Sequence, residues 1–498
     1  VLLPPKRISV NFAPADFRKC GTSFDIGVAA AILLAMDFVP ETYIKDTLFV
    51  GELSLNGQIC PISGVLPIVV AASKRGIKRC IVAQENVAEA AFVEQMEVIG
   101  CRNLEELFFY LKHGYIINDD SGEILENSGN ISEDSGKECT IQDVKKSQEI
   151  SESTRSLNLK STVLVKDILE NADEDKISVT DFSEVKGQVM AKRAMEIAAA
   201  GYHNLMLGGP PGVGKSMLAS CISGIMPQMT TEEMIDTTII YSAKGLLKDS
   251  FSLITKRPFR NPSLAVTQAG MFGGGMTPQP GEISLAHHGI LFLDEFPEYK
   301  REIIEMLRVP LEKHEISIVR KEQTLTFPAD FLLSVCANSC PCGYYPMDKC
   351  RCTYRQIVKY QNRISGPILD RIDLFVRCEE IGYEALTSNS KEESSADIRK
   401  RVSKAWEIQK ERFAQSTTLF NGRMNKNEVE IYCKLDEEGQ QLMKEAFSVF
   451  QLTGRSYFKI LKVARTIADL EGSYDIKSRH VEEALYFRQK GEGRVKVR

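Results

Sequence analysis

The feature that most constrains the fold is a glycine-rich segment near the middle of the chain, GGPPGVGKS. It fits the pattern G-x-x-x-x-G-K-[ST] and follows an apolar stretch, Asn204–Leu207, that is typical of a buried strand. Such glycines let the backbone curl so that its N–H groups point at phosphate oxygens, while the lysine and the hydroxyl serve the outer phosphates and Mg²⁺. We therefore expect an α/β unit with a nucleotide-binding loop. The residues predicted to bind nucleotide are Gly209, Pro210, Pro211, Gly212, Val213, Gly214, Lys215 and Ser216.

A second motif, ILFLDE, is an apolar run of buried-strand type that ends in the carboxylates Asp294 and Glu295. We expect Asp294 to bind Mg²⁺ through water, with Ser216 as a further ligand, and Glu295 to polarise the water that attacks the last phosphate. A glycine-rich loop can arise by chance, but here both motifs occur in the expected order. The sequence predicts a protein that hydrolyses ATP, or one built like such an enzyme.

Composition agrees with a soluble globular protein, since 43% of the 498 residues are apolar and 26% are charged. No apolar run reaches the ~18 residues that a membrane span needs. Thirteen cysteines, most of them isolated, indicate a reducing compartment, which we expect to be the cytoplasm. A net charge of −5 argues against polyanion binding over the whole surface but allows a local basic track. The chain opens on Val1, so we expect it to begin inside a domain.

Four parts are expected along the chain: an α/β domain over residues 1–113, an acidic and polar linker over 114–178, the ATPase core over 179–380, and a helical lid over 381–498. Low aromatic content predicts that the linker is partly disordered. In the first domain we expect strands at Ile8–Phe12 and Thr47–Val50 and helices at Phe24–Met36 and Val87–Glu97. Apolar positions at helical spacing predict lid helices at Ala396–Phe413, Asn427–Cys433, Glu437–Val449, Gly454–Glu471 and Ser478–Gln489.

Two further polar residues of the core are candidates for catalysis. Asn338 ends the predicted strand Phe331–Ala337, where it could cap a helix; we prefer a role in positioning the attacking water. Arg371 lies in LDR, before a new strand, and could form a salt bridge with Asp370 or Asp373. We prefer an arginine finger that enters the neighbouring subunit's site and neutralises charge in the transition state. That role requires an oligomer.

If Arg371 acts on the neighbouring subunit, the lid must supply a second cation to its own site. Arg455 is the first choice because it opens the helix Gly454–Glu471, whose start can face the phosphates. Lys462, further along the same helix, is the second choice.

Four cysteines lie close together in CPCGYYPMDKCRC, in the arrangement C-x-C-x7-C-x-C. Four thiolates can close a tetrahedral zinc site without an open position, so the predicted Zn²⁺ is structural. The C-x-C spacing is tighter than the usual C-x2-C, and buried free cysteines are the alternative. Catalysis by these cysteines is not expected because no histidine accompanies them. The predicted ligands are Cys340, Cys342, Cys350 and Cys352, and the knot would brace the loop between Asn338 and Arg371.

Longer segments resemble the ComM/YifB family of magnesium-chelatase-like AAA+ ATPases. They are DFSEVKGQ (Asp181–Gln188), RPFRNP (Arg257–Pro262), GGGMTPQPGEISLAHHGILFLDEFPE (Gly273–Glu298), SGPILDRIDLFV (Ser365–Val376), ESSADIRKRV and KILKVARTIADLEG. The resemblance implies an AAA+ P-loop module with an all-α lid. This chain departs from the family pattern after RPFRNP, where Ser263 and Leu264 replace two histidines, and at Ser339, which replaces a proline.

The first domain resembles the proteolytic domain of Lon, through KCGTS (Lys19–Ser23), GELSLNGQICPISGV and AASKRG. Ser23 falls where Lon has its nucleophile. The loop that supplies Lon's lysine base reads Ser63-Gly64-Val65-Leu66-Pro67-Ile68 here, and Lys19 and Lys74 do not match that position. Without a base the hydroxyl stays a weak nucleophile, so we expect a Lon-like fold without peptidase activity.

The family resemblance implies a homo-oligomeric ring, expected to be a hexamer, that binds single-stranded or branched DNA and drives branch migration in recombination or natural transformation. A predicted hairpin, Glu315–Arg320 and Gln323–Phe327, gives the sequence's own support. Basic residues surround its turn, and six copies would make a track for phosphates; an ordinary solvated hairpin is the alternative. These candidates for DNA binding are Lys313, His314, Arg320 and Lys321.

Two other functions remain open. One is the motor subunit of a magnesium chelatase, a protein-remodelling role; the absence of a Lon-like domain from that family favours the DNA function. The other is an ATP-dependent chaperone whose Lon-like domain binds protein. The sequence does not separate a DNA motor from a protein remodeller.

Overall fold

A computed structural model describes residues 8–11, 23–93, 96–118, 123–126, 180–247, 253–275, 278–320, 323–383 and 392–489. The chain forms two compact units. The N-terminal unit combines Val1–Asp175 with Thr238–Leu253, and the C-terminal unit combines Lys176–Thr237 with Ile254–Arg498. The helix α8 (Thr231–Ala243) therefore contributes residues to both units.

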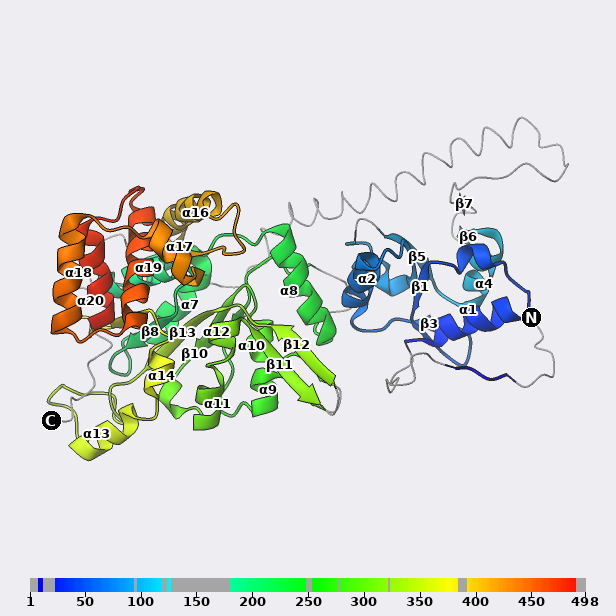
Figure 1. The fold of residues 1–498 in the computed structure, drawn as a ribbon. Coiled ribbons are helices and arrows are strands. Elements are labelled where there is room, and N and C mark those ends of the chain that lie inside the picture. The colour runs from blue at the N-terminus through cyan, green and yellow to red at the C-terminus, as the bar shows by residue number, and fades with distance from the viewer. Residues whose placement is uncertain are drawn as a thin grey trace. The chain divides into compact units, whose positions relative to one another are not determined.

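The N-terminal unit is built on a parallel three-stranded sheet in the order β1-β4-β5. Alternate residues of these strands enter two separate apolar clusters, so both faces of the sheet are buried. Helices α1 and α4 cover one face, and α2 and α3 cover the other (Figure 1). The bounds are α1 Asp25–Ala35, β1 Thr47–Val50, β2 Glu52–Leu53, β3 Ile59–Cys60, α2 Val65–Lys74, β4 Arg79–Ala83, α3 Val87–Ala90, β5 Glu97–Cys101, α4 Leu104–His113, β6 Tyr115–Asn118 and β7 Glu123–Glu126.

Two expectations for this part of the chain are wrong. Ile8–Asn11 form no strand, and Phe12 lies outside the described residues. The helix predicted over Val87–Glu97 ends at Ala90, because Glu97 opens strand β5, where its carboxylate accepts a hydrogen bond from Arg79 of β4 at 3.0 Å. The predicted linker begins with a hairpin of β6 and β7, whose register pairs Tyr115 with Glu126; residues 127–178 lie outside the described part.

The C-terminal unit contains a parallel five-stranded sheet in the order β14-β8-β13-β10-β9. The first strand in the chain, β8, thus lies between the last two, and the chain crosses from β8 to the far edge at β9. Such a change of direction opens a ligand site beyond the carboxyl ends of the strands. The strand bounds are β8 Leu205–Gly208, β9 Phe259–Arg260, β10 Ile290–Leu293, β13 Leu332–Ala337 and β14 Leu374–Arg377, and a separate antiparallel hairpin pairs β11 Glu315–Arg320 with β12 Gln323–Pro328.

Both faces of this sheet are buried. Ile290 and Phe292 of β10 join one core with α6, α7 and the lid helices, while Leu291 and Leu293 join another with α9, α10 and α11 (Figure 1). The remaining helices are α6 Val189–Gly201, α7 Lys215–Ile225, α9 Gln268–Phe272, α10 Glu282–Leu285, α11 Arg301–Met306, α12 Pro310–Lys313, α13 Tyr354–Gln361, α14 Gly366–Leu369, α16 Ser395–Arg412, α17 Lys426–Tyr432, α18 Glu437–Val449, α19 Gly454–Leu470 and α20 Ser478–Gln489.

The predicted α/β class with an all-α lid is confirmed, and the five lid helices begin and end within one residue of the predicted positions. Among the described residues, no helix is both long enough and apolar enough to cross a membrane.

Candidate nucleotide site

The glycine-rich loop connects the carboxyl end of β8 to the start of α7. Gly209 lies so close to β14's end that a Cβ there would meet the Cys378 carbonyl at 2.6 Å, and Gly212 and Gly214 adopt φ of 82° and 79°. These conformations favour glycine. Gly214 is the N-cap of α7 and offers no side chain to its first N–H groups. The helix start is therefore arranged as an anion-binding site.

The carboxyl ends of the strands form one edge of the sheet, which we call the carboxyl edge. Lys215 lies at its centre. Its Nζ donates to the carbonyls of Gly209 and Pro210 at 3.0 and 2.7 Å and to Oδ1 of Asn338 at 3.1 Å. Burial lowers the pKa of Lys215, and the nearby carboxylates Asp294 and Glu295 act in the opposite direction. All three acceptors are neutral, so the ammonium has positive charge to offer a phosphate.

The second motif reaches the same place from β10. The Ser216 hydroxyl donates to Oδ2 of Asp294 at 2.6 Å, and Oδ1 of Asp294 accepts the backbone N–H of Glu295 at 2.8 Å. A hydroxyl and a carboxylate are oxygen ligands of the kind that Mg²⁺ prefers. These residues fit a Mg²⁺ ion, which would neutralise charge on bound phosphates.

Glu295 and Asn338 end neighbouring strands. Glu295 is exposed and adopts a left-handed backbone with φ of 48°. Asn338 follows β13, whose Ala337 pairs with Gly208 of β8, and its side chain contacts Lys215 rather than capping a helix. A cavity of about 340 Å³ opens beside it, with Gly209 and the aromatic rings of Tyr345, Tyr360 and Phe375 in its wall. A bound molecule therefore has room at this edge.

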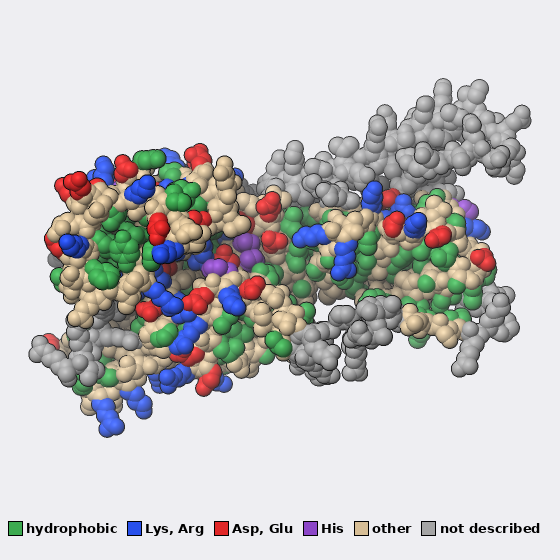
Figure 2. All heavy atoms as spheres, in the orientation of Figure 1, with side chains coloured by type: hydrophobic (Ala, Val, Ile, Leu, Met, Phe, Trp, Pro, Cys, Tyr) green, Lys and Arg blue, Asp and Glu red, His purple; other side chains and the backbone are tan. Residues whose placement is uncertain are grey.

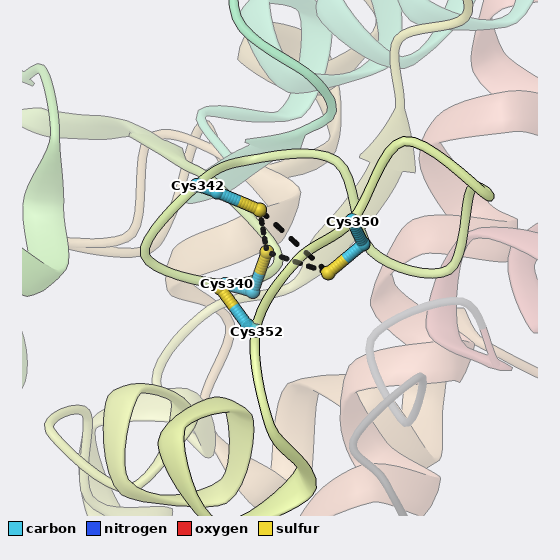
Figure 3. A group of neighbouring side chains, drawn as sticks. All are labelled: Cys340, Cys342, Cys350 and Cys352. Atoms are coloured by element: carbon cyan, nitrogen blue, oxygen red, sulfur yellow. Dashed lines mark hydrogen bonds between the residues drawn. The ribbon is translucent and has the colours of Figure 1, made fainter.

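The four cysteines predicted from the sequence converge in a loop after Asn338 (Figure 3). The sulfur of Cys340 lies 3.3 Å from that of Cys342 and 3.7 Å from that of Cys350, and the last two are 3.6 Å apart. With Cys352, all four sulfurs lie within 4.8 Å of one another. Cys340 is buried and the other three are half-buried. This donor set fits a tetrahedral metal site.

The cysteine loop also contacts the phosphate loop directly. Gly343 adopts φ of 86°, and a Cβ there would lie 2.5 Å from Cδ of Pro211. The amide of Gln361 donates to the Ser339 carbonyl at 3.0 Å and holds the start of the loop. The knot therefore braces Asn338 on one side and the phosphate loop on the other.

Comparison with known proteins shows relatives that align with almost the whole of this chain. The chain is 36% identical over 488 residues to "Competence protein ComM" of Haemophilus influenzae, which covers 97% of this chain and 86% of that protein. It is 35% identical over 492 residues to "Uncharacterized protein YifB" of Escherichia coli, with 97% and 85% covered. This chain belongs to the ComM/YifB family of magnesium-chelatase-like AAA+ ATPases.

Three family models match this ComM/YifB chain. The model described as magnesium chelatase, subunit ChlI, matches residues 181–386; its C-terminal companion matches 392–488; and a model described as subunit ChlI of Mg-chelatase matches 1–86. A further similarity covers a fifth of the chain, with 36% identity over 104 residues to "Lon protease 2" of Bacillus subtilis, 18% of that protein. The predicted family and the Lon-like similarity are confirmed.

In this ComM/YifB chain, Arg371 does not contact its own nucleotide site. Its guanidinium pairs with the Glu312 carboxylate, and Nη1 donates to the Pro367 carbonyl at 2.5 Å. Its Nε is buried without a partner. The predicted alternative of a salt bridge with Asp370 or Asp373 is wrong, because Asp373 pairs with Lys459 instead.

The lid does not bring the proposed second cation to the phosphate loop. Lys462 donates to the Gly422 carbonyl at 3.2 Å, and burial lowers its pKa to about 8. Arg455 is exposed, and its neighbour Ser456 accepts from Arg488, which also bonds Ile372. Ile372 precedes β14, so α19 begins at the amino-terminal edge of the sheet, whereas the phosphate loop lies at the carboxyl edge. The prediction of a cation supplied in cis by Arg455 or Lys462 therefore disagrees with the structure.

The structure describes the side chains of two of the four basic residues predicted around the hairpin, Lys313 and His314. Lys313 is exposed at the end of α12, but Nδ1 of His314 lies 3.3 Å from the Asp330 carboxylate. The side chain of Arg320 and all of Lys321 lie outside the described part of the chain. Of the four predicted contacts, His314 is engaged within its own chain.

In the Lon-like unit, the Ser23 carbonyl accepts the Gly51 N–H at 3.2 Å ahead of α1. The stretch in place of Lon's lysine loop begins α2, where the N–H of Leu66 donates to the buried Glu89 carboxylate at 3.0 Å. Lys74 ends this helix, and Lys19 lies outside the described residues. In the part of the chain that the structure describes, no lysine is hydrogen-bonded to the Ser23 hydroxyl.

Sequence reasoning missed a set of residues at the amino-terminal edge: Asn204, Lys459 and Arg488, all of which hold the segment that carries Arg371. One signal of this network was present in the sequence, the acidic residues Asp370 and Asp373 beside Arg371. It suggested Arg371 as their cation, whereas Asp373 pairs with Lys459. The family motif RPFRNP has a structural role, since Arg257 pairs with Glu233 at 2.8 Å and lies over the ring of Trp406 from the lid.

Proposed function

We propose that this protein is an ATP-hydrolysing ring motor that acts on DNA. One observation supports the ATPase most: the Lys215 ammonium, the Asn338 amide, the Ser216 hydroxyl and the Asp294 carboxylate meet at one edge of the sheet although they come from three separate segments. Membership of an AAA+ ATPase family points the same way. ATP and Mg²⁺ are the cofactors that these groups fit.

The roles follow from charge and position. The N–H groups at the start of α7 and Lys215 would bind phosphate oxygens, and Ser216 and, through water, Asp294 would hold Mg²⁺, which would neutralise phosphate charge. Glu295, exposed and adjacent to Asp294, accepts a proton from the attacking water, and Asn338 orients that water. Arg371 acts on the site of the neighbouring subunit, for which it must leave Glu312.

We propose that the four cysteines hold one structural Zn²⁺ per chain. Their sulfurs are close enough for a single ion, and their loop contacts both Asn338 and the phosphate loop. The metal would then stabilise the catalytic edge without touching nucleotide.

DNA is the proposed substrate because a full-length relative is named a competence protein. Exposed Lys313 lies next to the hairpin of β11 and β12, and a hexameric ring would present six copies of this basic residue. On the face shown in Figure 2, basic and acidic side chains are interspersed. On this face, DNA binding would therefore rest on local clusters and not on a broad basic surface.

Protein remodelling, as by a chelatase motor subunit, is the second candidate. Three family models named for that subunit favour it. One of them matches residues 1–86, so the N-terminal unit does not separate the two functions in the way that the sequence suggested.

Mobility shifts with single-stranded, duplex and branched DNA decide between them. We expect the Glu295→Gln chain, trapped with ATP, to bind branched or single-stranded DNA, and these DNAs to stimulate hydrolysis by the unmodified chain. The Lys215→Ala chain is the control that should show neither effect. ATP hydrolysis that no DNA binds or stimulates would favour the remodelling function.

A further inference from the structure

The segment that carries Arg371 is held at its base by three donors from other parts of the C-terminal unit. The Arg371 carbonyl accepts the side-chain amide of Asn204 at 2.9 Å, and the Ile372 carbonyl accepts Nη1 of Arg488 at 2.6 Å. The Asp373 carboxylate accepts Nζ of Lys459 at 2.5 Å. Three consecutive residues are thus each fixed by a different partner.

Two of the three donors belong to the lid. Lys459 lies in α19 and Arg488 in α20, whereas Asn204 precedes β8 and bonds β13 as well, through the N–H of Leu333 at 3.0 Å. Arg488 also lies over the Phe375 ring of β14 at 5.3 Å. The base of Arg371 therefore connects the lid to the sheet.

The Lys459 contact is strong for a physical reason. Asp373 is buried, which acts to raise its pKa, but the Lys459 ammonium, together with His203 and the backbone N–H of Asn204, outweighs this effect and lowers the pKa to about 2. A buried ion pair of this kind is costly to break, because either partner left alone would be an uncompensated charge. A displacement of the lid therefore costs less free energy if the segment 371–373 moves with it, because the ion pair then stays intact.

The tip of Arg371 is held separately. Glu312, which is half exposed at the end of α12, pairs with the guanidinium, and Nε of Arg371 has no partner. The guanidinium is thus held at its tip by a surface carboxylate that a phosphate can replace, while the lid holds the two residues that follow Arg371 in the chain.

We infer that the lid positions Arg371, the residue that acts on the neighbouring subunit. When the lid moves, Lys459 and Arg488 move the segment that carries Arg371. This inference rests on the proposed role of Arg371. Lys459 and Arg488 are positioning residues, since neither touches nucleotide. The state of one subunit's lid then sets the rate of hydrolysis in the next subunit.

The test uses Arg488→Gln in the full chain, with Arg479→Gln as the matched control. Arg479 lies in the same helix but pairs with Glu471, away from the segment 371–373. We expect Arg488→Gln to lower kcat by about tenfold to a hundredfold, the usual effect of a displacement near 1 Å, with nucleotide affinity unchanged. Arg488→Lys, which keeps a charged donor, should recover most of kcat, and Arg479→Gln should leave kcat unchanged.

Mixing experiments separate positioning from general damage. Lys215→Ala chains carry an intact Arg371 and an intact lid, so adding them to Arg488→Gln chains should restore hydrolysis, as it should for Arg371→Ala chains. Damage to the variant's own phosphate loop would not be rescued. Fluorescence of Trp406, the single tryptophan, verifies that the lid is folded.

Two results would overturn the inference. One is a wild-type kcat for Arg488→Gln; the other is loss of activity that Lys215→Ala chains do not rescue while they rescue Arg371→Ala. Failure to rescue Arg371→Ala itself would instead reject the shared site of the proposed function, and the inference with it.

Discussion

The two edges of the five-stranded sheet differ in how their charged groups are partnered. At the carboxyl edge, Lys215 bonds two carbonyls and an amide, and Asp294 bonds a hydroxyl and a backbone N–H. At the amino-terminal edge, Asp373 pairs with Lys459 at 2.5 Å and Asp330 with Arg423 at 2.8 Å. Lys215 and Asp294 therefore have neutral hydrogen-bond partners, whereas Asp373 and Asp330 are each paired with a cation of the lid.

This difference separates a binding site from a structural network. The lid contributes Lys459 and Arg423 to the amino-terminal edge, where their charge neutralises buried carboxylates. At the carboxyl edge, Lys215 and Asp294 have neutral partners, which a phosphate and a cation can displace. Each prediction below alters one edge and compares it with the other.

The largest effect is expected from Lys215→Ala, which should abolish ATP binding because the ammonium is the main positive charge of the phosphate loop. Lys462→Ala at the amino-terminal edge is the control, and it should leave affinity within about twofold because the Lys462 ammonium donates to the Gly422 carbonyl, away from the phosphate loop. A fluorescent ATP analogue measures both. Equal losses of affinity would remove the distinction between the two edges.

Arg371→Ala should lower kcat by a factor on the order of 10³, as arginine fingers do, without weakening nucleotide binding. Mixing with Lys215→Ala chains should return part of the activity, since some interfaces then pair an intact phosphate loop with an intact Arg371. If mixtures that exchange subunits stay inactive at every ratio, Arg371 does not act on a neighbour.

Glu295→Gln should keep ATP binding and slow hydrolysis by a factor on the order of 10², because the amide no longer accepts the proton of water. Glu298→Gln is the control, as this carboxylate pairs with Arg363 at 2.5 Å three residues further on. Steady-state phosphate release measures both. Normal turnover by the Glu295→Gln chain would show that another group is the base.

Removal of metal from the cysteine knot should lower the thermal stability of the C-terminal unit and leave the nucleotide-binding residues themselves intact. Elemental analysis of chelator-free protein should find one zinc per chain, and Cys350→Ser should reduce that content. Cys433→Ser, in the lid and outside the knot, is the control for zinc content. Protein purified without stoichiometric metal would contradict the prediction.

The smallest effect concerns His203 at the amino-terminal edge. Burial lowers the pKa of His203 to about 4, although Asp373 acts to raise it. As pH falls from about 6.5 to about 4, the unfolded chain binds a proton that folded His203 does not, so stability falls by up to about 1.4 kcal/mol per pH unit. Denaturant unfolding followed by Trp406 fluorescence should show a flatter pH dependence for His203→Gln. The exposed His113→Gln should not change it.

Much of the candidate site follows from sequence because its motifs are local. A strand, a turn with positive φ and a helix start place Gly209, Gly214 and Lys215 within seven residues, so their relation is fixed by short-range geometry. The cysteine knot spans thirteen residues and could be predicted for the same reason. Strong helical periodicity likewise fixed the five lid helices.

Predictions failed where contacts between residues distant in sequence determine the local structure or the ion-pair partner. Val87–Glu97 reads as a helix, but parallel pairing with β4 makes Glu97 the start of a strand. The partner of Arg371 could not be identified from its neighbours, because Glu312 is 59 residues away and Asp373 is already neutralised by Lys459.

The sequence by itself determined the phosphate loop, the two carboxylates, the cysteine set and the helical lid, since each depends on residues close together in the chain. Only the tertiary structure decided which edge of the sheet the lid covers. That choice is made by buried charges distant in sequence, Asp373 with Lys459 and Asp330 with Arg423, because a buried carboxylate must find a cation wherever the fold brings one. It removes Arg455 and Lys462 from their own subunit's phosphate loop.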